Sequence, residues 1–277
     1  MAISNPPGYE TGSVTTESGT SIHFQHFQQA HSGLCVVLLH SLAMDHTFWR
    51  LVAPTLAEKV SVVCIDVRGH GQSGKPPGPY SIALFAQDVK AVIDALSYKK
   101  VLIAGASMGG CISLQFALDY PELSAGLGLF DTTSWYGTTA PEDWNERANK
   151  ARTDGFASMA KFQTTRWFGD EFRAQNPELV QECIDIFGAN DLEAYCATCE
   201  AMGAFNVQSR LSEIKIPTAI VVGADDYATP IPMAQHLHYS IIGSSLKVIP
   251  HARHLTPLET PHIIIETLAQ LLTVIDS

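Results

Sequence analysis

Short apolar runs alternate along the chain with stretches in which apolar residues recur every three or four positions. The short runs cover residues 34–39, 61–65, 101–104, 125–130, 218–222 and 246–249. Runs of this length, almost free of charge, are typical of strands buried on both faces of a sheet. A helical pattern separates each successive pair, so the sequence predicts an α/β fold with a mostly parallel central sheet.

The two ends of the chain complete this pattern. Residues 14–17 and 21–27 predict two strands joined at Ser18-Gly19-Thr20, a β-hairpin that opens the domain. Early in the core we expect one helix through residues 48–56 and another that begins after Ser81, its N-cap. Pro261 begins the last amphipathic helix.

Residues 132–209 depart from the alternation, because they hold several helical patterns and no convincing strand. They follow the sixth expected strand, so we interpret them as a helical cap inserted into a core of residues 1–131 and 210–277. Asn176-Pro177 is expected to start one cap helix and Gly188 to end it. Three tryptophans in this segment are candidate substrate contacts, although aromatic stripes are also typical of an ordinary helical core: Trp135, Trp144 and Trp167.

The composition limits the partners of the protein. A formal charge of −11 at pH 7 and a pI near 5.4 argue against binding to nucleic acid or an anionic membrane, since phosphate contacts need clustered Lys and Arg. No apolar run approaches the ~18 residues that span a bilayer, and the N-terminal residues lack a leader pattern. We therefore expect a cytoplasmic protein, and no pattern indicates an oligomeric state.

The cysteines and histidines predict neither a metal nor a cofactor. Six cysteines lie mostly within apolar periodic segments, where a reduced thiol packs as a small hydrophobic group. Cys196-x-x-Cys199 lies inside a helical pattern without a second pair, and the sequence has no H-E-x-x-H spacing. Several histidines are expected to be surface or internally satisfied side chains: His23, His26, His31, His236, His238 and His262.

The strongest chemical signal lies in residues 101–120, where an apolar run, a glycine-rich corner and a helical pattern follow one another. The corner, from Gly105 to Gly109, reads G-x-S-x-G. In a strand-to-helix corner this pattern puts the serine on a strained turn at the edge of the sheet, and the glycines let the helix pass close to neighbouring strands. Ser107 is therefore the candidate nucleophile, and the helix N-terminus faces any anion formed beside it.

A serine hydroxyl is a weak nucleophile, so Ser107 needs a base, and the base needs an orienting acid. His254 lies in the loop after the last expected strand and is the candidate base. The loop after strand 218–222 offers Asp225 and Asp226. Asp131, at the end of strand 125–130, is a rival carboxylate at the same edge of the sheet.

The chain order Ser, Asp, His and five matching stretches make the chain similar to the α/β-hydrolase superfamily along its whole length. Within that superfamily it most resembles 3-oxoadipate enol-lactonases and related capped hydrolases. The matching stretches are HSLAMDHTFW, DVRGHGQSGKPPGPYS, GASMGG, FNVQSRLSEIKIPTAIVVGADDYATP and IPHARHLTPLETP. The resemblance implies the α/β-hydrolase fold, with helices on both faces of the sheet and a helical cap after the sixth strand.

The resemblance also implies roles for individual residues. Ser107 would be the nucleophile, His254 the general base and then the general acid, and Asp226 the acid that orients His254. The backbone amides of Leu42 and Met108 would form the oxyanion hole.

Other polar residues near the expected site are assigned structural roles. Ser41 stands where the family often has glycine, although a serine suits the enol-lactonase pattern. Asp66, Arg68 and His70 are expected to hold a turn, and His40 to brace the loop that carries the oxyanion-hole amide.

These observations predict a cofactor-free serine hydrolase that cleaves a small ester or lactone, an enol-lactone being one candidate. An enol-lactone substrate of this kind carries a carboxylate, yet residues 132–209 hold six bases against twelve acids, so no general attraction for anions is visible. One Arg under the cap would suffice to bind the carboxylate of such a substrate. The alternatives are a carbon–carbon bond hydrolase or a cofactor-independent oxygenase or haloperoxidase on the same scaffold, and a non-catalytic ligand sensor.

Overall fold

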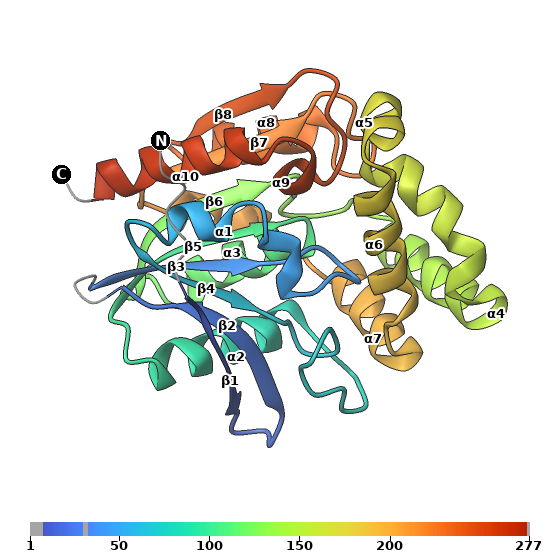
Figure 1. The fold of residues 1–277 in the computed structure, drawn as a ribbon, viewed down its shortest axis with the longest axis horizontal. Helices are drawn as coiled ribbons and strands as arrows, with labels where there is room; N and C mark the ends of the chain where they lie inside the picture. Colours follow the sequence, from blue (N-terminus) through green and yellow to red (C-terminus); the bar gives the residue numbers. More distant parts are fainter. Residues whose placement is uncertain (1–7, 30–32, 276–277) are drawn as a thin grey trace.

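The computed structural model describes residues 8–29 and 33–275, which form one eight-stranded sheet with helices around it (Figure 1). The strands are β1 (Glu10–Thr15), β2 (Ser21–Phe27), β3 (Leu34–Leu39), β4 (Ser61–Ile65), β5 (Lys100–Ala106), β6 (Ser124–Phe130), β7 (Thr218–Gly223) and β8 (Ser245–Ile249). Their spatial order is β1-β2-β4-β3-β5-β6-β7-β8. β2 pairs antiparallel with β1 and β4, and all later pairs are parallel, which confirms the predicted sheet.

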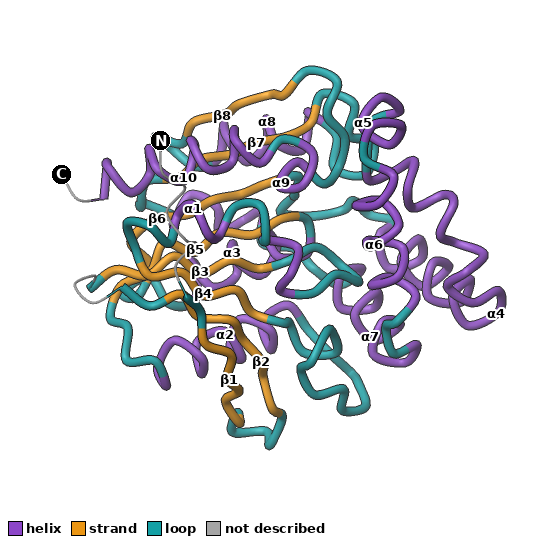
Figure 2. The backbone as a smooth tube through the Cα atoms, viewed as in Figure 1, coloured by secondary structure: helices purple, strands orange, loops and turns teal. Residues whose placement is uncertain are grey.

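Helices cover both faces of the sheet, as the tube in Figure 2 shows. One face carries α2 (Ile82–Ala95), α3 (Met108–Asp119), η2 (Gln208–Glu213) and α8 (Ile231–Ser240), and the other carries α1 (Ala53–Leu56) and α10 (Pro261–Ile275). The central strands β3, β4 and β5 are buried almost throughout, because layers of apolar side chains pack on each side.

Two local expectations were wrong. The first strand of the hairpin begins and ends earlier than predicted, because residues 16–20 form the turn: Thr16 N donates to Thr20 O at 2.9 Å, and Gly19 adopts φ 79°. The helix expected over residues 48–56 is divided into a short 3₁₀ helix, η1 (His46–Trp49), and α1. Pro54 accounts for the break, because it has no N–H to donate and its ring is tolerated only in a first helical turn.

A helical insertion follows β6, as predicted. It contains α4 (Ala140–Trp167), α5 (Asp170–Gln175), α6 (Pro177–Gly188) and α7 (Leu192–Gly203), which lie together beyond one end of the sheet (Figure 1). α4 is interrupted at Gly155, whose φ of 72° and ψ of 166° are not helical. Pro177 and Gly188 bound α6 as expected, but the side chain of Asn176 donates to Phe172 O instead of capping the helix, because Asn176 also ends α5.

All six cysteines are buried free thiols. Cys196 and Cys199 lie within α7 and pack as part of the core, as the sequence predicted. Among the described residues, no helix combines the length and the apolar character needed to cross a bilayer.

Candidate active site

Ser107 lies between β5 and α3 with φ 55° and ψ −116°, a conformation that non-glycine residues seldom adopt. The surrounding backbone holds it there: Ser107 N donates to Phe130 O at 2.9 Å, and Ser107 O accepts from Cys111 N at 3.1 Å and from Thr132 Oγ1 at 2.7 Å. Strain of this kind persists only where neighbouring contacts determine the backbone. The predicted strained turn is therefore present.

Glycines let the helix approach the strands at this corner. A Cβ added to Gly105 would lie 2.2 Å from the carbonyl carbon of Gly109. A Cβ on Gly109 would lie 2.1 Å from Leu39 O at the end of β3. Both are backbone atoms with little freedom to yield, so the position of Ser107 depends on these two glycines.

Two loops at the carboxyl ends of β7 and β8 bring an imidazole and a carboxylate to Ser107. His254 Nε2 lies 2.9 Å from Ser107 Oγ, and His254 Nδ1 lies 2.8 Å from Asp226 Oδ2. All three side chains are buried. An ionised carboxylate can only accept a hydrogen bond, so His254 Nδ1 carries the ring proton and donates a hydrogen bond to Asp226. The Nε2 lone pair is then free to accept a hydrogen bond from the serine hydroxyl.

The loop around Asp226 keeps it ionised. Its Oδ1 accepts from Ala228 N at 2.7 Å and Thr229 N at 3.1 Å, and its Oδ2 accepts from Thr229 Oγ1 at 2.8 Å. Burial alone would raise the pKa of this carboxyl, but the charge and hydrogen bond of His254 and the Thr229 hydrogen bonds outweigh burial and lower the pKa to about 2.

The rival carboxylate, Asp131, is fully buried and has other partners. Its Oδ1 accepts from Gly223 N at 3.1 Å, and its Oδ2 accepts from the backbone N and Oγ1 of Thr256 at 2.9 and 2.6 Å. Burial and the nearby charge of Asp226 raise its pKa. Asp131 therefore joins the loop that carries Asp226 to the loop that carries His254. Asp225 is exposed.

The loop after β3 carries Leu42 and is braced by His40. The Nε2 atom of His40 accepts from Val67 N at 3.0 Å, and its Nδ1 donates to Ser41 O at 2.8 Å. Burial lowers the pKa of this imidazole, which favours the neutral form that both hydrogen bonds require. Leu42 lines the same cavity as Ser107 and His254, and Met108 opens α3, where the first amides have no intrahelical partner.

The cap closes a cavity over Ser107 and His254. Of the three candidate tryptophans, Trp144 and Trp167 line it. Trp135 is not among the described lining residues and instead forms an isolated bridge with Asn206. The lining also includes cap side chains that the sequence did not single out as site residues: Tyr136, Arg147, Gln163 and Arg166.

Two arginines in this lining form no salt bridge with a described Asp or Glu. Six of the eight arginines of the chain pair with an Asp or Glu. Within the part of the chain that the structure describes, no such pair includes Arg147 or Arg166. Arg147 Nε donates to Tyr195 OH at 2.7 Å, and its guanidinium lies 5.4 Å from the ring centroid of Trp144. Burial, followed by the charge of Arg147, lowers the pKa of Arg166 to about 10.

Gln163 adds an unpaired amide to the same wall. Its side chain is 1% exposed, and neither Nε2 nor Oε1 has a hydrogen-bond partner among the described residues. A buried amide without partners is costly in a folded protein. Gln163 therefore offers one donor group and one acceptor to a molecule in the cavity.

The turn after β4 is structural, as predicted. Arg68 is buried and forms a bidentate pair with Asp88, at 2.8 and 2.6 Å. His70 Nδ1 donates to Arg68 O at 3.1 Å, and burial lowers the pKa of His70 to about 3. Neither side chain is among the lining residues described for the cavity over Ser107.

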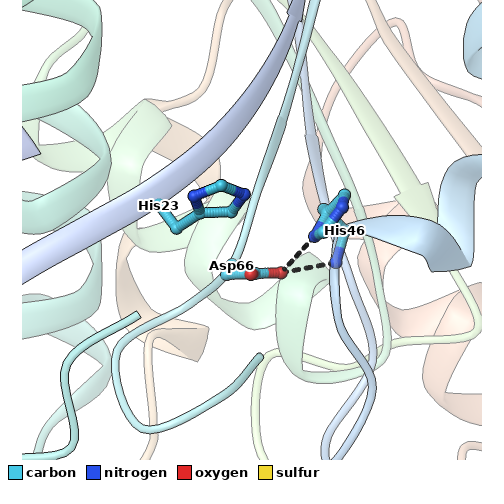
Figure 3. Close-up of side chains that lie close together, drawn as sticks. All are labelled: His23, His46 and Asp66. Atoms are coloured by element: carbon cyan, nitrogen blue, oxygen red, sulfur yellow. Dashed lines mark hydrogen bonds and ion pairs between the residues drawn. The ribbon is translucent and has the colours of Figure 1, made fainter. Parts of the chain in front are cut away.

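Most of the remaining histidines are on the surface or satisfied, as expected. His26 bonds Tyr98 OH, His238 bonds Ser244, and His236 and His262 are exposed; His31 lies outside the described residues. His23 contradicts the expectation, because it is buried and its Nε2 has no hydrogen-bond partner among the described residues. It lies beside His46 and Asp66, in a group whose side-chain chemistry suits a metal ion (Figure 3).

Comparison with known proteins places the fold. A family model described as "alpha/beta hydrolase fold" matches residues 35–152. The chain is 29% identical over 255 residues to 3-oxoadipate enol-lactonase 2 of Acinetobacter baylyi, which covers 92% of this chain and 94% of that protein.

Solved structures agree with this relationship. The enol-lactonase from Burkholderia xenovorans LB400 superimposes with a TM-score of 0.90 at 28% identity, covering 95% of this chain and 100% of that one. A thermophilic esterase from Thermogutta terrifontis, with malate bound, gives a TM-score of 0.88 at 26% identity, covering 97% and 100%.

Proposed function

We propose that this chain, which has the α/β-hydrolase fold, is a cofactor-free serine hydrolase that cleaves a small, carboxylate-bearing ester or lactone through an acyl-enzyme on Ser107. One observation carries the proposal: hydrogen bonds of 2.9 and 2.8 Å join Ser107 Oγ to His254 Nε2 and His254 Nδ1 to Asp226 Oδ2, and Ser107 and His254 line the cavity. A serine nucleophile is activated by this order of groups, in which the hydroxyl bonds a neutral imidazole and the imidazole bonds an ionised carboxylate.

Acylation follows from this geometry. Ser107 Oγ attacks the carbonyl carbon of the substrate while His254 Nε2 takes the hydroxyl proton. Asp226 then stabilises the imidazolium, because its ionised carboxylate already accepts a hydrogen bond from His254 Nδ1. The oxyanion that forms is bound by the amides of Leu42 and Met108, which the braced loop after β3 and the N-terminus of α3 present.

Collapse of the intermediate breaks the bond to the leaving oxygen, which takes the proton from His254 Nε2. In an ester the alcohol leaves, whereas in a lactone the released oxygen stays attached to the acyl chain. Water then attacks the acyl-enzyme, His254 again acts as the base, and the acid product leaves Ser107 free. An enol-lactone would release an enol that converts to a ketone, so its ring would not close again.

The arginines support a substrate that carries a carboxylate. Arg147 and Arg166 line the cavity and form no salt bridge with a described Asp or Glu, whereas the other six arginines are paired. A planar guanidinium binds a carboxylate through two parallel hydrogen bonds. Gln163 supplies a donor and an acceptor beside them for a carbonyl or hydroxyl group. The enol-lactonases among the relatives are consistent with such a substrate.

Paired substrates test the substrate class. Mono-p-nitrophenyl glutarate carries a free carboxylate and p-nitrophenyl butyrate does not. We expect kcat/KM for the glutarate to fall about tenfold to a hundredfold in Arg166→Gln, the usual loss for one charged hydrogen bond, with little change for the butyrate. Arg152→Gln is the matched control, since Arg152 lies on the same helix but pairs with Glu193 and Glu200. An equal fall in kcat/KM for both substrates would refute the proposal that the substrate carries a carboxylate.

The reaction class is tested separately at the nucleophile. A fluorophosphonate should label the wild type at Ser107 and leave Ser107→Ala unlabelled, and hydrolysis should collapse in that variant. An oxygenase or peroxidase that depends on His254 would keep most of its activity without the serine hydroxyl. Labelling that is equal in both proteins would refute the acyl-enzyme.

A further inference from the structure

A second polar site lies on the β2 side of the sheet, at residues outside the lining of the cavity over Ser107. His23 on β2, His46 at the start of η1 and Asp66 directly after β4 come from three separate segments. One ligand atom from each lies within 4.8 Å of the other two. Figure 3 shows the His23 ring and the His46 ring facing the Asp66 carboxylate from different directions.

The unpaired nitrogen of His23 indicates that the group is incomplete. His23 is 7% exposed, and its Nε2 is buried with no hydrogen-bond partner among the described residues. Its backbone is fixed, because His23 N donates to Ser73 Oγ at 2.8 Å and His23 O accepts from Asp66 N at 3.0 Å. The ring centroids of His23 and His46 are 5.2 Å apart. A buried imidazole nitrogen held in this way lacks a ligand or a donor.

Hydrogen bonds also fix His46 and Asp66 beside His23. Asp66 Oδ1 accepts from the backbone N of His46 at 2.6 Å and from His46 Nδ1 at 2.9 Å, and Asp66 Oδ2 accepts from Gln72 N at 2.8 Å. Gly71 allows the turn to pass this close, since a Cβ there would lie 2.4 Å from the Asp66 carboxyl. The carboxylate is thus oriented by backbone amides and keeps one oxygen toward both imidazoles.

We propose that His23 Nε2, His46 Nδ1 and Asp66 Oδ1 bind a divalent transition-metal ion such as Zn²⁺. Two imidazole nitrogens and one carboxylate oxygen suit Zn²⁺ and its neighbours, whereas Mg²⁺ and Ca²⁺ prefer sites made of oxygen alone. Binding at His46 Nδ1 displaces the proton that this atom now shares with Asp66. A neutral ring then carries its proton on Nε2, whereas an imidazolium releases one proton to solvent. Water completes the coordination.

This site would stabilise the loop before η1 without taking part in hydrolysis. The metal would join β2, the turn after β4 and the segment that follows Leu42. Because a ligand that binds only the folded state stabilises it, the melting temperature should rise by a few degrees once free Zn²⁺ exceeds the dissociation constant about a hundredfold.

The test is calorimetric titration of the EDTA-treated full chain with Zn²⁺, in two buffers of different ionisation enthalpy. We expect one saturable site per chain, and the two buffers separate the heat of metal binding from the heat of any proton released. Co²⁺ should give a visible absorption band from nitrogen ligation. His23→Gln and His46→Gln should each weaken binding at least about tenfold, the usual cost of a lost ligand or ligand partner. His26→Gln is the control, because this buried histidine lies on the same strand and bonds Tyr98 OH instead.

Two results would overturn the proposal. The first is a wild type with no saturable binding at micromolar Zn²⁺, which would mean that a water molecule satisfies His23. The second is binding by His23→Gln that equals the wild type, which would place the metal elsewhere. The wild-type titration decides the matter even if a variant fails to fold.

Discussion

Replacing Asp226 by Asn would test the triad at the residue where the sequence left a choice. The two amides of Ala228 and Thr229 donate to Asp226 Oδ1, so an Asn side chain keeps its oxygen there and turns its NH₂ toward His254 Nδ1. Two donors cannot pair, and the imidazole therefore takes the opposite tautomer. Nε2 then carries the proton and faces Ser107, so it cannot accept the serine proton.

The magnitude follows from the loss of the base. In comparable triads the Asp to Asn change lowers turnover about 10⁴-fold, which corresponds to roughly 5 kcal/mol of transition-state stabilisation at 1.36 kcal/mol for each factor of ten. We expect turnover to fall here by roughly three to four orders of magnitude, because the serine and the oxyanion hole remain. The variant should still fold, since the Asn oxygen keeps both backbone hydrogen bonds, and the Thr229 hydroxyl and His254 Nδ1 can each accept from the new NH₂ group.

The assay is kcat/KM for a p-nitrophenyl ester, with Ser107→Ala defining the background. Asp225→Asn is the matched control, because Asp225 is the exposed neighbour in the same loop, and it should lose less than about tenfold, or 1.4 kcal/mol. Asp131→Asn should also lose less than about tenfold per folded molecule, because Asp131 bonds Gly223 and Thr256. A crippled Asp131→Asn beside an active Asp226→Asn would refute the reasoning.

Three further predictions rest on the same geometry. Gly109→Ala should lower the free energy of unfolding by about 3 kcal/mol or more in urea titrations, because its Cβ would meet Leu39 O at 2.1 Å, whereas Gly188→Ala, with open space around it, should be neutral or stabilising. The pKa of Asp226 is lowered from 3.8 to about 2, so its contribution to the free energy of unfolding is present above about pH 4 and is lost as the pH falls toward 2. The stability of Asp226→Asn should therefore depend less on pH in this range. An equal loss of stability in the wild type and the variant would argue against this. Iodoacetamide at neutral pH should leave hydrolysis intact, since burial raises the pKa of the Cys111 thiol to about 11, and inactivation with Cys111 alkylated would contradict this.

The candidate triad could be located from the sequence because each member follows a strand end in a local pattern. Ser107 lies in a pentapeptide whose glycines have a steric purpose, and Asp226 and His254 come directly after β7 and β8. Parallel strands bring such loops to one edge of the sheet, so the strand pattern alone predicts that they meet. The glycine contacts show why that pattern is restrictive.

The walls of the cavity could not be located in this way. Arg147 and Arg166 were two of six bases in an acidic segment. What distinguishes them is that they line the cavity and form no salt bridge among the described residues, which depends on how the two halves of α4 pack on either side of Gly155. Counting the acids and bases of residues 132–209 cannot show which side chains lie in the cavity. Trp135 is the converse case, because this aromatic residue of the insertion forms a bridge with Asn206 and is not among the described lining residues.

The His23 group was missed for a related reason. Motifs for metal sites describe ligands on one helix or in one loop, whereas these three ligand atoms come from β2, η1 and the turn after β4. Only the antiparallel pairing of β2 with β4 brings His23 beside Asp66, and sequence spacing contains no record of that pairing.

The hydrogen bonds of Asp131 join the middle of the chain to its last quarter. Its acceptor oxygens bind Gly223 and Thr256, which are 92 and 125 residues further along the chain. A chain that ends after β6 lacks both partners, so its Asp131 carboxylate would need water instead. The segment that supplies these partners also carries Asp226 and His254. We therefore expect a nascent chain to complete the candidate triad only after its C-terminal segment has left the ribosome and docked.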